Sequence, residues 1–371
     1  MKLKRYAVSF LAATVLASWA VAQEASRPLG LPSVPVPVDN LQDEVKIQLG
    51  DKLFHDKRFS SDGTVSCATC HAREKAFTDS PLPVSEGVGK QKGTRNAPTV
   101  INAAYNHSQF WDGREPDLES QSGQPFLNPV EHGLKDYDPI LKIVRTDPEY
   151  RELFRRVFGK SGKEITIEEV KKAIASFERT IISGDSPFDR YYYGGDTTAM
   201  SESAIRGLQV FLGPGRCVSC HTITDTHALF TDNRFHNLGV GFDSISKDLK
   251  EMATAFTKAK KEGTNVDIAV LTNGNTSELG RFAITGQWRD IGAFKTPGLR
   301  NVAVTDPYMH DGSLETLDDV VEFYNLGGRM DESEPINSFQ SGGIRPLNLS
   351  DRQKDDLVEF LRALTSPEYK K

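Results

Sequence analysis

The four cysteines of this chain form two copies of one short motif. In each copy the two thiols are spaced to add across the two vinyl groups of one haem, and the next residue offers an imidazole to the iron. The sequence therefore predicts two covalently bound haem c groups, with the His of each motif as an iron ligand. The motifs are Cys67-Ala68-Thr69-Cys70-His71 and Cys217-Val218-Ser219-Cys220-His221.

Cysteine pairs at this spacing also occur in zinc sites and in dithiol redox centres. Here His follows each pair directly, no Cys is left over, and no close pair of His residues would complete a zinc site. The spacing favours haem over zinc or dithiol chemistry. Because every Cys is then attached to haem, we expect no disulfides.

The first residues are typical of an export signal. Lys2, Lys4 and Arg5 precede an apolar run that ends in a small-residue pattern at Ala22, as in secretory signal peptides. We expect residues 1–22 to be removed and the mature protein to lie in the periplasm, which suits haem attachment to reduced thiols. No other stretch of the sequence approaches the length of a membrane span.

Size and charge limit the domain organisation and the partners. Removing 22 residues from 371 leaves 349, which suggests two domains with one haem each. We place the boundary at Gly194-Gly195-Asp196, giving domains 23–195 and 196–371. Loss of three cations changes the net charge from −6 to −9, which argues against nucleic acid or an anionic membrane as a partner and suits a basic redox protein.

Apolar periodicity predicts a helix in front of each haem motif. Val45, Leu49 and Leu53 repeat at four-residue steps before the first motif, and residues 201–212 carry a similar apolar face before the second. The two halves thus share a helix-then-haem order.

Three further helices start at Ser or Thr caps, namely at Thr166, Thr316 and Ser350. Strand signals are sparse, so we expect a mainly α protein of two cytochrome c-like domains. The charged stretch 247–263 is predicted to be a solvated insertion.

These residues resemble the bacterial di-haem cytochrome c peroxidase family, which includes MauG. The likeness covers nearly the whole mature chain and rests on several motifs. It implies that hydrogen peroxide is reduced at the first haem, while the second relays electrons or stores oxidising equivalents. Besides the first haem motif, the motifs are Asn96-Ala97-Pro98-Thr99, Gln109-Phe110-Trp111-Asp112-Gly113-Arg114, Asn128-Pro129-Val130-Glu131, Leu299-Arg300-Asn301-Val302-Ala303 and Pro307-Tyr308-Met309-His310-Asp311-Gly312.

The resemblance implies a reactive pocket around Glu131. This residue matches the family's acidic group over the open face of the first iron, where a carboxylate can move a proton between the peroxide oxygens. A solvated surface Glu is the alternative interpretation. Gln121 and Pro125 match residues near the same pocket. Trp111 matches the indole between the two haems, with ordinary core packing as the alternative.

The first iron is expected to be open. Typical peroxidases of this family carry a second His on that haem at rest, in the loop before the Asn-Ala-Pro-Thr motif. No His stands between His71 and His107 in this sequence. We therefore expect a high-spin first haem that needs no reductive loss of a ligand.

The second haem is expected to have an oxygen ligand. Typical peroxidases of the family use Met on the side opposite the motif His, whereas MauG uses Tyr, and the matching position here is Tyr324. Packing of Tyr324 on an apolar helix face is the alternative, and Met330 is the rival ligand. His236 matches a His near the second haem of MauG.

The resemblance also implies a calcium ion between the domains, through positions matching Asn96, Thr305 and Pro307. Family peroxidases are often dimers, so a homodimer is a further expectation.

The surface Trp by which MauG oxidises its protein substrate is absent here, where residues 213–216 read Gly-Pro-Gly-Arg. Three functions stay open at this point: a peroxidase supplied by a small cytochrome c or a cupredoxin, a MauG-like oxidase of a partner protein, and a plain electron-transfer cytochrome.

Overall fold

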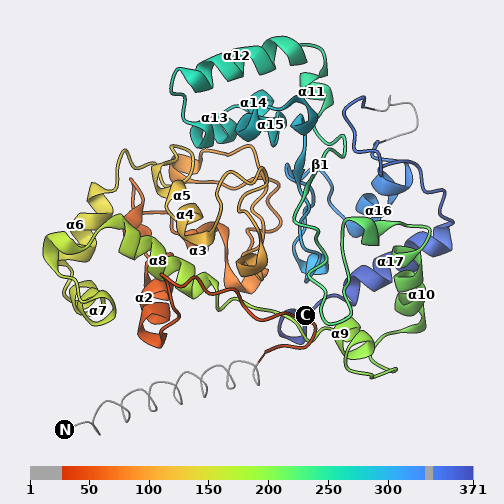
Figure 1. The fold of residues 1–371 in the computed structure, drawn as a ribbon, viewed down its shortest axis with the longest axis horizontal. Helices are drawn as coiled ribbons and strands as arrows, with labels where there is room; N and C mark the ends of the chain where they lie inside the picture. The colour runs from red at the N-terminus through yellow and green to blue at the C-terminus, as the bar shows by residue number, and fades with distance from the viewer. Residues whose placement is uncertain (1–26, 331–336, 371) are drawn as a thin grey trace, which may run out of the picture.

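The protein is mainly helical in the computed structural model, which describes residues 27–330 and 337–370. The predicted signal peptide, residues 1–22, lies outside the described residues. Figure 1 shows two groups of helices side by side and a third group across the top. The described chain has one small sheet, in which β1 (Phe235–His236) pairs antiparallel with β2 (Phe294–Lys295).

The first group packs around α2 (Glu44–His55) and α8 (Ile167–Glu178). Thr166 and Glu169 form the predicted capping box of α8. Gly50 lets the two helices approach closely, because a Cβ atom there would collide with the Ala173 carbonyl oxygen. The group is completed by α3 (Cys67–Cys70), α4 (Leu118–Gln121), α5 (Gln124–Leu127), α6 (Asp138–Thr146) and α7 (Pro148–Phe158).

The second group repeats this arrangement with α10 (Glu202–Leu212) and α17 (Asp351–Arg362). Gly207 lies where a Cβ atom would collide with the Asp356 carbonyl oxygen, as Gly50 does in the first group. Ser350 and Gln353 cap α17 as predicted. The group also contains α9 (Pro187–Tyr192) and α16 (Leu317–Asn325).

The third group corrects the prediction of a solvated insertion. Residues 249–261 form the amphipathic helix α12, which buries Leu249, Ala253 and Phe256 in a separate apolar cluster. The prediction failed because most of the charged residues of this stretch lie on the outer face of a helix whose inner face is apolar. The other members are α11 (Asp243–Ser246), α13 (Val266–Thr272), α14 (Gly274–Glu278) and α15 (Phe282–Thr285).

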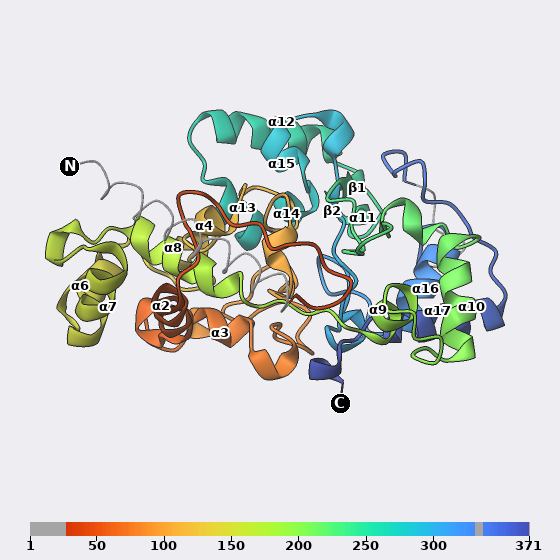
Figure 2. The same cartoon turned by 60° about the horizontal axis from the view of Figure 1, so that its bottom comes forward.

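Figure 2 shows that this third group lies over the region where the two main groups meet. None of the helices in the described residues is long and apolar enough to cross a membrane.

Candidate functional site

A cavity of about 730 Å³ lies between the two main helical groups. Most of the residues that the sequence and the resemblance single out as site residues border it, although they come from distant parts of the chain, and Met330 does not border it. On the first side these are Cys67, Cys70, His71, Asn96, Trp111, Gln121 and Glu131, and on the second side Cys217, Cys220, His221, His236, Thr305, Pro307 and Tyr324.

The two motif imidazoles are held in the same way. His71 Nδ1 lies 3.2 Å from the Phe77 carbonyl oxygen, and His221 Nδ1 lies 2.8 Å from that of Phe230. Both phenylalanines have left-handed backbones, with φ of 57° and 54°, which aims the carbonyl at the ring. Burial lowers the pKa of both histidines. A neutral ring that donates from Nδ1 presents the Nε2 lone pair to a metal.

The cysteines fit haem c. Ser66 and Thr69 form a capping box that starts α3 at Cys67, so both thiols of the first motif lie on one helical turn. Burial raises the pKa of Cys67, Cys70 and Cys217. Thiols that burial keeps neutral are poor metal ligands. A thioether bond to haem, by contrast, leaves the sulfur uncharged and is compatible with burial.

The second motif also has neighbours that could bind a metal. The ligand atoms of Cys220, Asp232 and His236 lie within 4.8 Å of one another, and His236 Nε2 is 2.9 Å from Asp232 Oδ2. Sequence reasoning missed Asp232 because it did not pair the motif with residues further along the chain. This grouping would need Cys220 as a thiolate, which a haem thioether excludes.

Glu131 borders the first side of the cavity with a buried oxygen, Oε2, that has no hydrogen-bond partner in the described part of the chain. Burial raises the pKa of Glu131, the nearby Asp267 raises it further, and Arg114 opposes both. An orphaned carboxylate oxygen in a cavity is costly unless a ligand or a proton satisfies it. The arrangement suits a group that takes up and releases a proton.

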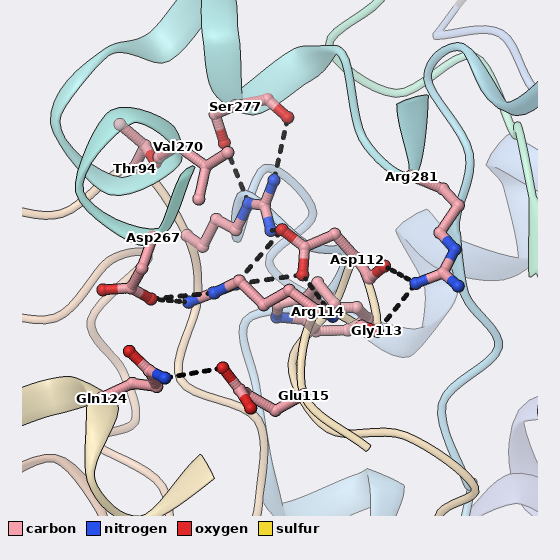
Figure 3. A network of polar contacts seen from close by, with 12 residues as sticks. Thr94, Asp112, Gly113, Arg114, Glu115, Gln124, Asp267, Val270, Ser277 and Arg281 are labelled. Atoms are coloured by element: carbon pink, nitrogen blue, oxygen red, sulfur yellow. Dashed lines mark hydrogen bonds and ion pairs between the residues drawn. The ribbon is translucent and has the colours of Figure 1, made fainter. Parts of the chain in front are cut away.

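Arg114 and Asp267, whose charges act on Glu131, belong to a buried network of charges that Figure 3 shows. Arg114 lies between Asp112 and Asp267, at 3.1 Å and 2.7 Å, and its guanidinium stacks 3.5 Å above the Phe110 ring. Burial opposes ionisation of Asp112, but Arg114 and Arg95 hold its pKa at about 2.

Much of this network comes from the third helical group. Asp267 belongs to α13, Ser277 in α14 accepts from Arg95 at 3.0 Å, and Arg281 donates to the Asp112 and Gly113 carbonyls. The third helical group thus holds the loop that carries Trp111 and Arg114.

Trp111 is fixed at the junction between the two halves. Its Nε1 donates to the Asn96 carbonyl at 2.9 Å, and its own carbonyl accepts from the Lys295 N–H at 2.7 Å. Asn96 N–H in turn donates to the His310 carbonyl at 2.8 Å. The indole is therefore tied to both halves of the chain.

Tyr324 borders the second side of the cavity from α16. Burial raises the pKa of its phenol, and its hydroxyl has no hydrogen-bond partner among the described residues. Met330 is 57% exposed and is not among the residues that border the cavity. An unpaired hydroxyl that faces the cavity beside the second motif fits a ligand atom for that site.

The structure shows a repeat that sequence reasoning missed. Residues 94–125 match residues 293–324 at a constant offset of 199, as in 111 and 310. In both copies a left-handed Asn, Asn102 or Asn301, follows a Pro-containing loop, and a turn with an Asp-Gly pair closes a short bridge. The shared Pro, Asn and Asp-Gly at equal spacing are the signal that could have revealed it.

His132, which carries none of the sequence motifs, also borders the cavity. It is buried, its Nδ1 lies 3.0 Å from the Phe59 carbonyl oxygen, and burial lowers its pKa to about 4. The ring is therefore neutral near Glu131.

Comparison with known proteins defines the family. A model described as di-haem cytochrome c peroxidase matches residues 44–198. Cytochrome-c peroxidase IdrP1 of Denitromonas iodatirespirans is 36% identical over 368 residues, which cover 98% of this chain and 93% of that protein. Methylamine utilization protein MauG of Methylorubrum extorquens is 35% identical over 332 residues, 90% of this chain and 81% of that one.

A solved structure agrees with these sequence matches. The crystal structure of a MauG-like protein associated with microbial copper homeostasis superposes with a TM-score of 0.75 at 32% identity, covering 93% of this chain and 98% of that one. The chain belongs to the di-haem cytochrome c peroxidase family and is an oxidoreductase of the cytochrome-c peroxidase type.

Proposed function

We propose that this protein is a periplasmic di-haem peroxidase, which reduces hydrogen peroxide to water with electrons from a small cytochrome c or cupredoxin. The observation that carries the proposal is the shared cavity, into which both Cys-x-x-Cys-His motifs and the orphaned oxygen of Glu131 open. A plain electron-transfer cytochrome has no use for such a carboxylate.

In this assignment haem c is attached to Cys67 and Cys70 with His71 as ligand, and to Cys217 and Cys220 with His221 as ligand. When bound, the first haem supplies the iron at which peroxide is reduced and the second supplies stored or relayed electrons. The engaged Nδ1 of each His fixes the ring for this task.

Glu131 is the proton-handling group of the proposal. Its unsatisfied oxygen can take the proton from one peroxide oxygen and return it to the other, which promotes uneven O–O cleavage. Arg114 and Asp267 fix the charge around it. Gln121 borders the same cavity and would contribute hydrogen bonding and shape.

Electrons are proposed to cross the junction through Trp111. Its ring nitrogen is fixed by the Asn96 carbonyl, and its main chain is fixed by Lys295. A held π-system between the two motifs shortens the path that an electron must cross.

The repeat supports different occupancy of the two irons. Tyr324 in the second copy corresponds to Pro125 in the first, and both border the cavity. A phenol can ligate iron and a proline ring cannot, so the second site is proposed to have an oxygen ligand and the first an open position. His236, held by Asp232, would contact the second haem.

Tyr324 also favours a second candidate function, a MauG-like oxidase of a partner protein. A phenolate is a hard, anionic ligand that stabilises ferric and higher states of iron. The Gly-Pro-Gly-Arg segment at 213–216, in place of an exit Trp, favours the peroxidase instead.

One experiment separates the candidates. The all-ferric protein is mixed with hydrogen peroxide in a stopped-flow instrument while haem and near-infrared absorption are recorded, with and without a reduced small cytochrome c. Rapid turnover that consumes the cytochrome supports the peroxidase, and a long-lived near-infrared band supports the oxidase. No reaction with peroxide would contradict both and leave an electron carrier.

Several finer assignments are part of the same proposal. Calcium would bind near Asn96, Thr305 and Pro307, which all border the cavity; the Asn96 amide nitrogen donates to the Pro83 carbonyl, leaving its oxygen for a cation. Domains 23–195 and 196–371 would each hold one haem, and the change of apolar cluster between Ile181 and Phe188 supports a junction close to that boundary. Dimerisation stays a prediction.

A further inference from the structure

Lys295 is a buried cation that the proposed chemistry does not use. It lies in β2, is 9% exposed, and borders the cavity. Its ammonium has no hydrogen-bond or ion-pair partner within residues 27–330 and 337–370. Burial alone lowers its pKa to about 8.

The neighbouring cations differ from Lys295 in this respect. Each buried arginine on the cavity wall has a carboxylate at ion-pair distance, so its charge is compensated by the protein. The pairs are Arg95 with Asp112, Arg114 with Asp112 and Asp267, and Arg300 with Asp189. An ammonium without a counter-charge is unfavourable at a buried position, and an anionic group that enters the cavity would pair with it.

The repeat shows that this charge belongs to one half only. Lys295 corresponds to Asn96 in the first copy, at the same offset of 199. Both use their N–H in the same way, Asn96 to the His310 carbonyl and Lys295 to the Trp111 carbonyl. The Asn96 amide, however, is satisfied by the Pro83 carbonyl at 3.1 Å, whereas the Lys295 side chain is not satisfied.

We propose that Lys295 forms an ion pair with a propionate of a haem at the junction between the two halves, and that it thereby raises the reduction potential of that haem. The inference rests on the proposed haem content. Haem propionates would bring carboxylates into the cavity, and a charge-assisted hydrogen bond to an ammonium satisfies both partners. Because the same residue holds the Trp111 carbonyl, Lys295 is a positioning residue that fixes the haem relative to the indole.

The test replaces Lys295 by Met, which keeps the length and removes the charge, and by Arg, which keeps the charge. Both haem potentials are measured by spectroelectrochemical titration after haem content has been determined by the pyridine haemochrome assay. In Lys295→Met, the reduced-to-oxidised ratio of one haem at fixed potential should fall on the order of tenfold, about 59 mV for a one-electron couple. Lys295→Arg should stay close to the wild type.

The outcomes are distinguishable. Fewer than two haems in the wild type would overturn the proposed function itself. Two haems with both potentials unchanged in Lys295→Met, or an equal fall in Lys295→Arg, would overturn the role of Lys295 alone. If Lys295→Met fails to retain haem, full loading of Lys295→Arg supports the need for a cation, and failure of both variants contradicts it.

Discussion

The two halves of the molecule use one scaffold with different side chains at the positions that face the cavity. Both pack two helices through a glycine, present a Phe carbonyl to the motif His, and repeat the loop of 94–125 at 293–324. The first copy has Asn96, Trp111 and Pro125 where the second has Lys295, His310 and Tyr324.

The two copies of the loop therefore differ at a few positions that face the cavity, and in the proposed function these substitutions give the two haems different tasks. In the proposed assignment, Pro125 would leave the first iron open and the phenol of Tyr324 would ligate the second. The carboxylate of Glu131 is added on the first side only, and the third helical group supplies Asp267 to hold its neighbour Arg114. Glu278 from the same group lies 2.9 Å from His310, between Oε2 and Nε2. The third helical group therefore contacts both copies of the loop.

The largest expected effect follows from removing the proton-handling group of the first half. Glu131→Gln keeps the shape but cannot accept a proton, so the rate of reaction with peroxide should fall by about 10²–10⁴-fold. Stopped-flow absorbance measures this rate. Glu251→Gln on the exposed face of α12 is the matched control, and a Glu131→Gln rate within about threefold of the control would exclude the assigned role.

A large loss of stability is expected at the equivalent Asp residues of the two loops, but only in the first half. Asp112→Asn leaves Arg95 and Arg114 without their shared carboxylate, so the free energy of unfolding should fall by about 3–5 kcal/mol. Asp311→Asn, at the matching position, removes a carboxylate that accepts from the Ser313 N–H, and should cost less than about 1 kcal/mol. Denaturant unfolding of the two variants compares them directly, and equal losses would contradict the contrast.

Tyr324→Phe should make the two halves alike at their irons. Without the phenol oxygen, the second site loses its proposed ligand, and the ferric high-spin signal in electron paramagnetic resonance should about double. Tyr324→Met restores a ligand and should bring the signal back towards the wild type. An unchanged spectrum in Tyr324→Phe would exclude Tyr324 as the iron ligand and leave Met330 as the rival ligand.

The open first iron is tested by the same spectra. If the wild type proves to have a six-coordinate first haem, His132 is the imidazole in the described residues that borders the cavity beside Glu131. Conversion to high spin in His132→Leu would then show that Pro125 does not by itself leave the iron open.

A smaller effect is expected at the junction. Trp111→Phe keeps an aromatic ring but loses the hydrogen bond to the Asn96 carbonyl, and electron transfer between the haems should slow by about tenfold, equivalent to 1.4 kcal/mol in the barrier. Rapid-mixing kinetics of the half-reduced protein measure it. Trp288→Phe, at an exposed indole, should leave the rate unchanged, and an equal slowing in both variants would argue against a relay at Trp111.

The smallest effect is a pH shift. Because burial and Asp267 raise the pKa of Glu131, the carboxylate is protonated at low pH and the peroxide reaction should quicken as pH rises through that pKa. Asp267→Asn removes a neighbouring anion, so the midpoint should move to lower pH. The pH profile of the stopped-flow rate checks both, and a sloped profile that persists in Glu131→Gln would assign the titration to another group.

The sequence alone determined the local features and the family. The adjacency of Cys, Cys and His predicts haem, because thioether attachment and ligation use neighbouring residues. The caps at Thr166, Thr316 and Ser350 predict helix starts, and the structure confirms them. The predicted solvated stretch was wrong, because charge on one face of α12 concealed the apolar face beneath it.

Only the tertiary structure decided which distant residues share the cavity. Asp267 and Glu131 are far apart in sequence, and their electrostatic coupling arises because α13 packs over the loop of Arg114. The unpaired ammonium of Lys295 is likewise visible only when its surroundings are known. Covalent chemistry is encoded in short spacings, whereas burial and charge compensation depend on how the whole chain folds.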